Sequence, residues 1–558
     1  MHSTPKNIFP FLALMGAFLM LLPAKLHAQT KTTTTTAQAQ DLKKSLQKML
    51  DYQKEVNEAL SAVNIIYDGT LTVEPQDGYY ATTFPHIYIS GPEHQESYAQ
   101  ENPPEKVVFD IGAIKMNLMP SEKPENWKAT IVLPQEMTMY DALKGTADPD
   151  RFTLTFNEQR SIGLYNEKLG YFTKMDMNLL GLTFMTGEQA QDSRLGGVQF
   201  YTNLEEQENG RFSGPGHFLL SGLHIAQPDQ DTLVEIGEIK LDFSMEDLKM
   251  PDITAYKEKI LKHKETIQNL QLENPEEAQQ INAQNIHEMV KDIYDFDMSG
   301  LSAAYSAKDI SIKAPDNTTS QSADETPTRY QSTHLDNAKI GVVLSGLKTN
   351  QGTYGLELTY SGLKTTPQNP EMSDILPKEL KTEITAQNIP YNSLGTLIDN
   401  AITSVAQNPE TGKMILFSIV SRLPAIISQA GTQILVQNNK AANDIYNLTL
   451  NGNVTTDLSA MMGFKAQFNM LIEGLNTLID VSQKHSQKEE SPYAQQYKNL
   501  IPTLQTLKRI AKPATGADGK SAHSFVIETS DTGQFKINGQ NISTVFAAPS
   551  SEQPEQPQ

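Results

Sequence analysis

Apolar and polar residues alternate through most of the chain, and the clearest example is a ten-residue segment that occurs twice. The copies are FDIGAIKMNL at 109–118 and VEIGEIKLDF at 234–243, with the same residue at four positions and a similar residue at five of the other six. Alternation with period two is typical of a strand with one face on a core and the other toward solvent. The sequence therefore predicts a β building block that is used more than once.

Changes in this periodicity divide the chain into segments. Apolar residues at helical spacing from Leu42 to Leu60 predict an amphipathic helix. The predicted order is signal peptide 1–28, N-terminal helix 29–62, N-terminal β region 63–250, helical hairpin 251–298, second β region 299–392, helical group 393–440, C-terminal α+β region 441–546 and disordered tail 547–558. The predicted fold class is a β-rich α+β protein, in which a long antiparallel meander has two helical groups packed on it.

Turn and cap signals support this division. Gly78 sits where a hairpin within 69–84 needs positive φ. A small or polar residue followed by glycine recurs eight times, as in Ser345-Gly346, and predicts bulges or tight turns where strands end. The sequence Asn-Pro-Glu-Glu at 274–277 has the residues of a helix N-terminus, so the first helical insert is predicted to contain two helices.

The first 28 residues have the layout of a secretory signal peptide. Lys6 precedes an apolar run from Ile8 to Leu22, and Ala28 is a small residue suited to the cleavage site. The run is shorter than the roughly 20 apolar residues of a membrane span. We therefore expect a soluble periplasmic protein that is not integral to the membrane after cleavage, and an uncleaved anchor is the alternative.

Composition narrows the possible partners. The formal net charge is −21, which disfavours nucleic acid and anionic membrane surfaces because both require a basic face. The absence of cysteine excludes disulfides, thiolate chemistry and a lipid-modified N-terminal cysteine. Stability must therefore come from burial of apolar side chains.

Short motifs in the C-terminal part carry a resemblance to known proteins. They are Leu376-Pro-Lys-Glu-Leu380 leading to Asn388-Ile-Pro-Tyr391, the run Leu448-Thr-Leu-Asn-Gly452 through Gly463 to Ile472-Glu-Gly-Leu475, and Gly533-Gln-Phe-Lys-Ile-Asn-Gly539. This arrangement resembles exported bacterial families of unknown function, the YdgA-like group and its relatives. The resemblance implies an uncharacterised envelope protein and brings no catalytic residues with it.

Two segments imitate ligand-binding loops. A permissive phosphate-loop pattern ends at Lys520 and Ser521, but such a loop needs a strand before it and a helix after it. The sequence predicts the reverse order, so we expect a plain loop and no nucleotide. Asp295 opens a calcium-loop-like sequence whose twelfth residue is Ser306 rather than the required Glu, and we expect the end of a helix there.

Two Ser-x-x-Lys sequences imitate a catalytic motif. In enzymes with that motif the serine begins a helix, whereas Ser345 with Lys348 and Ser361 with Lys364 are predicted to lie in turns between strands. We expect neither pair to be catalytic.

Histidines and carboxylates give no recognisable site either. His217 with His224 would need a third metal ligand, and His287 lacks a second histidine at ligand spacing. The acidic pair Asp148 and Asp150 is predicted to be ordinary surface charge. We therefore assign no catalytic, cofactor-binding or metal-ligating residue and no cofactor from the sequence.

The function favoured by these patterns is non-enzymatic. One-sided alternation in many strands, together with 20 methionines, suggests a binding or scaffold protein of the cell envelope, with a lipid in a concave apolar groove or an envelope protein as partner. The same apolar face could instead be a closed core. An envelope hydrolase with acidic residues on loops and a surface adhesion or structural subunit are the alternative classes.

The signal sequence gives a direct prediction about processing. Because Ala28 ends the motif, the mature chain is expected to begin at Gln29 and to fractionate with soluble periplasmic proteins. N-terminal sequencing of the protein from its native compartment checks this. An intact Met1 in a membrane fraction would contradict it.

Overall fold

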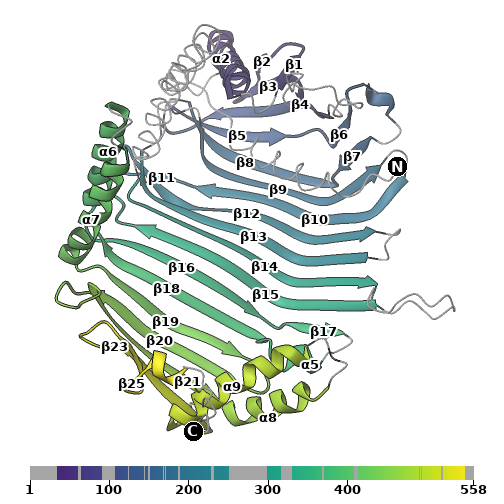
Figure 1. Cartoon of the computed structure of the whole chain (residues 1–558). Coiled ribbons are helices and arrows are strands. Elements are labelled where there is room, and N and C mark those ends of the chain that lie inside the picture. The colour runs from purple at the N-terminus through teal and green to yellow at the C-terminus, as the bar shows by residue number, and fades with distance from the viewer. Residues whose placement is uncertain are drawn as a thin grey trace, which may run out of the picture. The chain divides into compact units, whose positions relative to one another are not determined.

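The computed structural model describes residues 34–60, 64–90, 107–249, 298–315, 330–366, 370–488 and 491–546, with short gaps inside some of these ranges (Figure 1). The chain forms two compact units. The first comprises 1–226 and 236–298, and the second comprises 227–235 and 299–558. The predicted signal peptide, the helical hairpin over 251–298 apart from its last residue, and the tail from 547 lie outside the described residues.

The first unit contains one long helix and a series of strands. Its elements are α2 (Thr36–Leu60), β1 (Asn64–Asp68), β2 (Thr72–Pro75), β3 (Tyr80–Ser90), β4 (Val107–Pro120), β5 (Asn126–Val132), β6 (Glu136–Asp141), the 3-10 helix η2 (Gly145–Ala147), β7 (Phe152–Thr155), β8 (Glu158–Asn166), β9 (Tyr171–Thr186), β10 (Gln189–Asn203), β11 (Glu205–Glu206), β12 (Phe212–Gln227) and most of β13 (Thr232–Leu248). The helix α2 lies within the range 29–62 predicted for the N-terminal helix, and β1 to β13 lie within the predicted β region 63–250.

The second unit alternates strands with helices. Its elements are β14 (Gly300–Pro315), β15 (Tyr330–Ser345), β16 (Gly352–Ser361), β17 (Lys364–Thr366), α5 (Pro370–Ser373), β18 (Glu379–Ile389), α6 (Tyr391–Gln407), α7 (Gly412–Ala430), β19 (Gln433–Ala442), β20 (Asn447–Thr456), β21 (Phe464–Glu473), α8 (Leu475–Ser486), α9 (Ala494–Ile510), β22 (Lys512–Thr515), β23 (Ser521–Thr529), β24 (Phe535–Ile537), β25 (Gln540–Asn541) and α10 (Ile542–Val545).

Strand pairing is antiparallel in both units, which confirms the β-rich antiparallel class. In the second unit β14, β15, β16, β18, β19, β20, β21 and β23 pair one after another. The first unit is less regular, because β4 pairs with β3, β5 and β6, while β5 pairs with β8 and β7 with β9. The predicted hairpin is confirmed: β2 pairs with β3 through a turn in which Gly78 has φ +81°.

The core of the first unit forms between α2 and the strands. Leu42, Leu46 and Met49 lie on one face of α2 at helical spacing and are buried. The hydroxyl of Tyr80 on β3 donates to Oε1 of Gln38 at 2.7 Å, and its ring meets Trp127 edge-on at 5.8 Å. The apolar stripe of the helix is thus held on the sheet by a polar anchor beside its first turns.

The two copies of the repeated segment both lie in strands, one in β4 and one in β13. In β4 the alternation shifts at Gly112, where φ is +86° and the pairing with β3 skips Ile111. Glycine suits this bulge because other residues avoid positive φ. Whether the two strands belong to equivalent repeated units stays a prediction.

Two helical assignments differ from the sequence-based ones. The helical group predicted to continue to 440 ends at Ala430, and Gln433–Ala442 is the strand β19. That segment follows an apolar helix directly, but its backbone pairs with β18 on one side and with β20 on the other. The helix α8 was not predicted. None of the helices in the described part of the chain combines the length and apolarity that a transmembrane span requires.

The bulge at Gly112 gives a stability prediction. A Cβ at this position would meet Cγ of Pro134 at 2.8 Å, so Gly112→Ala suffers both the clash and the unfavourable φ. We expect it to lower the free energy of unfolding by about 1–3 kcal/mol. Denaturant unfolding followed by the fluorescence of Trp127, the chain's one tryptophan, reports on the first unit.

Gly69 is the matched control for this substitution. Its φ is +98°, but a Cβ there would have no atom within 4 Å. Gly69→Ala should therefore cost less than Gly112→Ala. Equal costs would show that the contact with Pro134 contributes nothing.

A second prediction concerns pH, because the carboxyl of Glu167 is buried and accepts a hydrogen bond from Trp127 Nε1 at 2.6 Å. Burial raises the pKa of Glu167 to about 7, against the opposing effect of that hydrogen bond. Because folding raises this pKa, the neutral carboxyl of Glu167 favours the folded state. The contribution is complete at pH values below 4.5, the pKa in the unfolded chain, and is lost as the pH rises through about 7, the pKa in the folded protein.

Glu167→Gln keeps an acceptor for the indole and removes the titration. At pH 8 we expect this variant to be more stable than the wild type by about 1–3 kcal/mol, with the difference shrinking toward pH 5. Denaturant unfolding across this pH range, again by Trp127 fluorescence, measures the difference. Glu136→Gln, at an exposed position of the same unit, serves as the control. A difference independent of pH would show that ionisation of Glu167 is not its cause.

Candidate functional site

The central strands of the second unit have one apolar face. Residues directly opposite each other in an antiparallel pair lie on the same face, so the register defines rows across β14, β15, β16, β18 and β19. The first row is Leu301, Leu344, Tyr354, Ala386 and Ile434; the second is Ala303, Val342, Leu356, Ile384 and Val436; the third is Tyr305, Ile340 and Leu358. We call these thirteen residues the apolar face.

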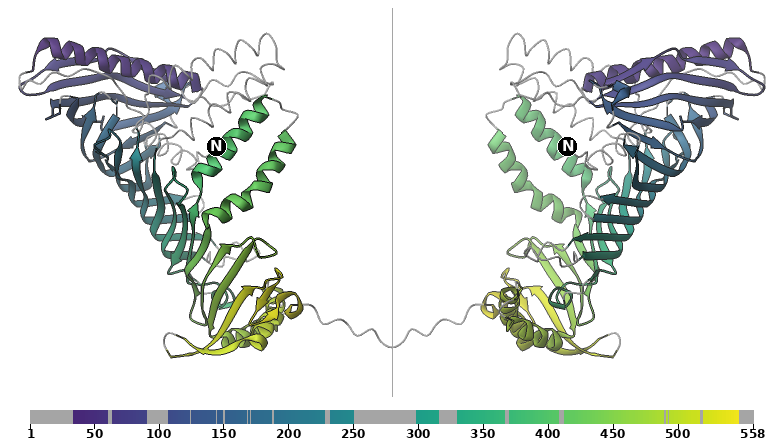
Figure 2. Two further views of the ribbon diagram at one scale, coloured as in Figure 1. Left: turned by 90° about the vertical axis from the view of Figure 1, so that its left-hand side faces the viewer. Right: turned by 90° about the vertical axis from the view of Figure 1, so that its right-hand side faces the viewer.

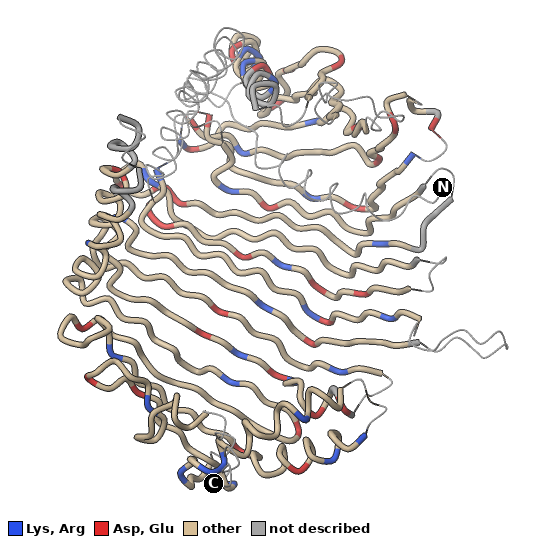
Figure 3. The backbone as a smooth tube through the Cα atoms, in the orientation of Figure 1, with Lys and Arg blue, Asp and Glu red and all other residues tan. Residues whose placement is uncertain are grey.

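The opposite face of the same strands is polar. Nζ of Lys339 lies 2.7 Å from Oε2 of Glu357, and Lys440 makes an equally short pair, 2.6 Å, with Glu379. Figure 3 shows residues of both charges along these strands. This face is therefore the one that suits contact with solvent, and the strands direct their apolar side chains to the other side.

The apolar face is only partly covered. Tyr305 and Ile340 are each 48% exposed and Leu358 is 42% exposed, although the three form one continuous row. In the first unit, the cross-strand pairs of Met177 with Phe200 and of Leu179 with Val198 are buried. The same kind of alternation thus produces a closed core in the first unit and an open surface in the second.

At its C-terminal end the apolar face continues under a helical cover. Met470 pairs with Phe525 and Leu448 pairs with Ile472, and these side chains pack with those of α8 and α9. Phe525 is only 1% exposed. The helices α8 and α9 therefore close the part of the sheet formed by β20, β21 and β23 and leave the part formed by β14, β15 and β16 open.

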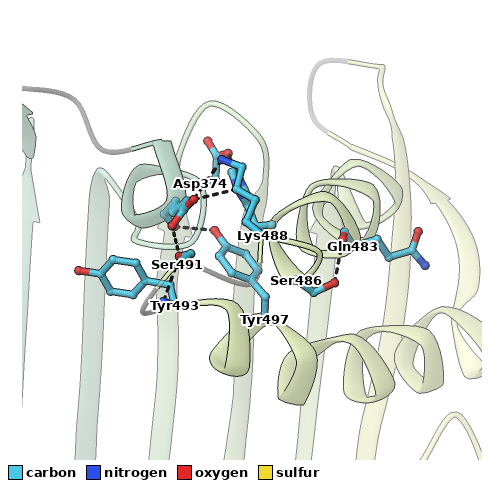
Figure 4. Close-up of polar contacts among 9 residues, drawn as sticks. Asp374, Gln483, Ser486, Lys488, Ser491, Tyr493 and Tyr497 are labelled. Carbon is cyan, nitrogen blue, oxygen red and sulfur yellow. Dashed lines mark hydrogen bonds and ion pairs between the residues drawn. The ribbon is translucent and has the colours of Figure 1, made fainter.

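A polar cluster fixes α8 and α9 in this position (Figure 4). His485 of α8 is buried and its Nε2 lies 2.8 Å from Oδ2 of Asp374, while its ring packs on Tyr497 of α9 at 4.9 Å. Tyr497 donates through its hydroxyl to the carbonyl of Glu371 at 2.5 Å. Both helices are thus tied to the segment around α5.

Glu371 is the charged centre of this cluster. Hydrogen bonds from the Ser491 hydroxyl and from Nζ of Lys488, the latter at 3.0 Å, hold the pKa of the Glu371 carboxyl below its usual value. Asn443 and Tyr446 add hydrogen bonds to backbone carbonyls of the same segment. The cluster acts as a clamp that sets where the helical cover lies.

The phosphate-loop-like and Ser-x-x-Lys motifs lie beside strands, as the sequence predicts, whereas the expected helix end at the calcium-loop-like segment is not found in its described residues. Ser521 begins β23, so a strand follows the phosphate-loop-like pattern as predicted, although the short strand β22 also precedes it. Ser345 and Ser361 end β15 and β16, which confirms that they lie where strands turn. Asp295 lies outside the described residues, and Ser306 is in β14.

The candidate ligand residues are not brought together. His217 and His224 lie seven residues apart on β12, about 23 Å along a strand at 3.3 Å per residue, which is too far for both to bind one metal ion. His217 stacks on Tyr201, and burial lowers the pKa of its imidazole. His287 lies outside the described residues. The part of the chain that the structure describes holds no group of three or more metal-ligating side chains.

The prediction for Asp148 was wrong. Its side chain is buried rather than exposed, and its carboxylate accepts a hydrogen bond from the backbone nitrogen of Asp141 at 3.2 Å. It therefore shapes the segment after β6. Asp150, its proposed neighbour, lies outside the described residues.

The comparisons with known proteins add no identity. No protein-family model matches the chain, and no curated protein matches it either. The similarity to the YdgA-like group therefore stays a prediction from short motifs, and the function is inferred from geometry.

The sequence did not predict α8, one of the two helices that cover the C-terminal strands. The buried residues of α8, Leu475, Ile479, Ser482 and His485, follow at intervals of four and three. That spacing is helical and could have indicated α8. The clamp had no comparable signal, because Glu371 and His485 are far apart in the sequence.

Proposed function

We propose that the protein is an exported, non-enzymatic binding protein of the cell envelope, and that its apolar face holds the acyl part of a lipid. The observation that carries the proposal is the exposed row of Tyr305, Ile340 and Leu358 within a wider apolar face. Soluble proteins rarely expose contiguous apolar patches of more than a few hundred Å². Such a patch is typical of a surface that meets an apolar partner.

The dimensions of the apolar face suit acyl chains. Its rows extend from Leu301 to Tyr305 of β14, four steps or about 13 Å at 3.3 Å per residue, and across five strands, four spacings or about 19 Å at 4.8 Å each. One leaflet of a bilayer's hydrocarbon core is about 15 Å thick. An extended acyl chain would therefore fit within the face.

The proposal includes the expected helical groups. The predicted hairpin over 251–298 and the pair α6 and α7 would border the meander, so that the lipid lies on a sheet flanked by helices. The ion pairs of the opposite face, such as that of Lys339 with Glu357, support the assignment of the lipid to one side only.

Two substitutions in β15 test this function. Ile340 and Val343 have the same exposure, 48%, but their separation of three residues places them on opposite faces. We expect Ile340→Glu to weaken binding of a fluorescent fatty acid about tenfold or more, because the charge would be desolvated by the bound chain. Val343→Glu should bind like the wild type.

The same variants should differ in the lipid they carry. Protein isolated from its native compartment is extracted, and the lipid is quantified by mass spectrometry. We expect stoichiometric lipid with the wild type and Val343→Glu and little with Ile340→Glu. Absence of lipid from the wild type together with no fatty-acid binding, or equal loss in both variants, would refute the proposal.

A further inference from the structure

The helix α7 exposes apolar side chains that no described element covers. Phe417 is 76% exposed and Val420, one turn later, is 57% exposed. Pro424, a further turn along, is also exposed. Residues three to four apart lie on one face of a helix, so these three form an apolar ridge along α7.

The charge of α7 differs from that of the whole chain. The protein carries a formal charge of −21, yet the 19 residues of α7 include two basic residues, Lys413 and Arg422, and no acidic one. Arg422 is exposed beside the ridge. Figure 3 shows that most of the described residues of α6 and α7 are neither acidic nor basic. An apolar ridge with a basic residue beside it suits a helix that rests in the interface of a bilayer.

The start of α6 and the end of α7, which we call the root of the helical pair, lie at one end of the apolar face. The α6 helix begins at Tyr391, directly after β18, and α7 ends just before β19 begins. The ring of Tyr391 packs closely on Gly352, and Asn392 donates to the carbonyl of Lys348 at 2.7 Å. Figures 1 and 2 show the two helices side by side at the ends of these strands and projecting from the sheet.

The first row of the apolar face lies at this same end of the strands. Tyr354 and Ala386 on β16 and β18 are within a few residues of the root of α6, and Ile434 follows the end of α7 by four residues. A lipid that leaves a bilayer in contact with α7 would therefore meet apolar side chains next.

We propose that α7 docks on a lipid bilayer through Phe417 and Val420 and that lipid passes between the bilayer and the apolar face at this point. The proposal rests on the lipid-binding function above. Attraction to anionic lipid is secondary, because only two basic residues of α7 oppose the negative charge of the chain. Insertion of the ridge supplies most of the binding, so neutral vesicles suffice.

Co-sedimentation of the full chain with phosphatidylcholine vesicles tests the docking. We expect the double variant Phe417→Glu with Val420→Glu to bind vesicles at least tenfold more weakly than the wild type. The matched control is Leu458→Glu with Met461→Glu, two exposed apolar residues of the β20–β21 connection, and it should bind like the wild type. The fatty-acid titration is run on each variant in solution.

The two readouts separate this inference from the function it rests on. Loss of vesicle binding with normal fatty-acid binding in the α7 variant supports the inference. Failure of the wild type to bind vesicles, equal loss in the control, or loss of fatty-acid binding along with vesicle binding in the α7 variant would overturn it. Absence of fatty-acid binding by the wild type would instead refute the proposed function, whatever the vesicles show.

Discussion

An antiparallel sheet whose strands alternate strictly has one apolar face, and that face must be covered. Full burial of a Leu, Ile or Phe side chain contributes about 1.5–3 kcal/mol, so a row of three that stays half exposed forgoes several kcal/mol. In the first unit α2 buries Leu42 and Leu46 against strands. In the second, α8 and α9 cover only the C-terminal strands. The open part of the sheet begins where this cover stops.

The clamp explains why α8 and α9 do not extend their cover by sliding along the sheet. His485 is buried against Asp374, and Glu371 holds Lys488 and Ser491. Displacing the helices would leave these polar groups desolvated and without partners, which costs far more than a surface ion pair is worth. The boundary between the closed and open parts of the sheet is therefore specified by polar contacts, while burial alone would favour a larger cover.

The sequence predicts the strands of this sheet but not which of its faces are exposed to solvent. Alternation at Leu301, Ala303 and Tyr305 marks one side of β14 as apolar, and turn signals such as Ser345-Gly346 mark where strands end. Exposure depends on which other elements lie above that side. The predicted helical group includes 433–440, but pairing with β18 and β20 makes this segment a strand. Asp148 is buried by contacts equally invisible in a local pattern.

The exposure of a single apolar side chain does not identify the site. A row of neighbouring exposed apolar side chains does. Val343 is as exposed as Ile340, yet its cross-strand neighbours are Ser302 and Gly355. An isolated apolar residue of this kind is ordinary on a protein surface. Ile340 lies between Tyr305 and Leu358, in a face whose further rows are also apolar, so water next to it is replaced at a gain by any extended hydrocarbon. The open part of the sheet therefore differs from the rest of the surface in how its apolar residues are arranged rather than in how many are exposed.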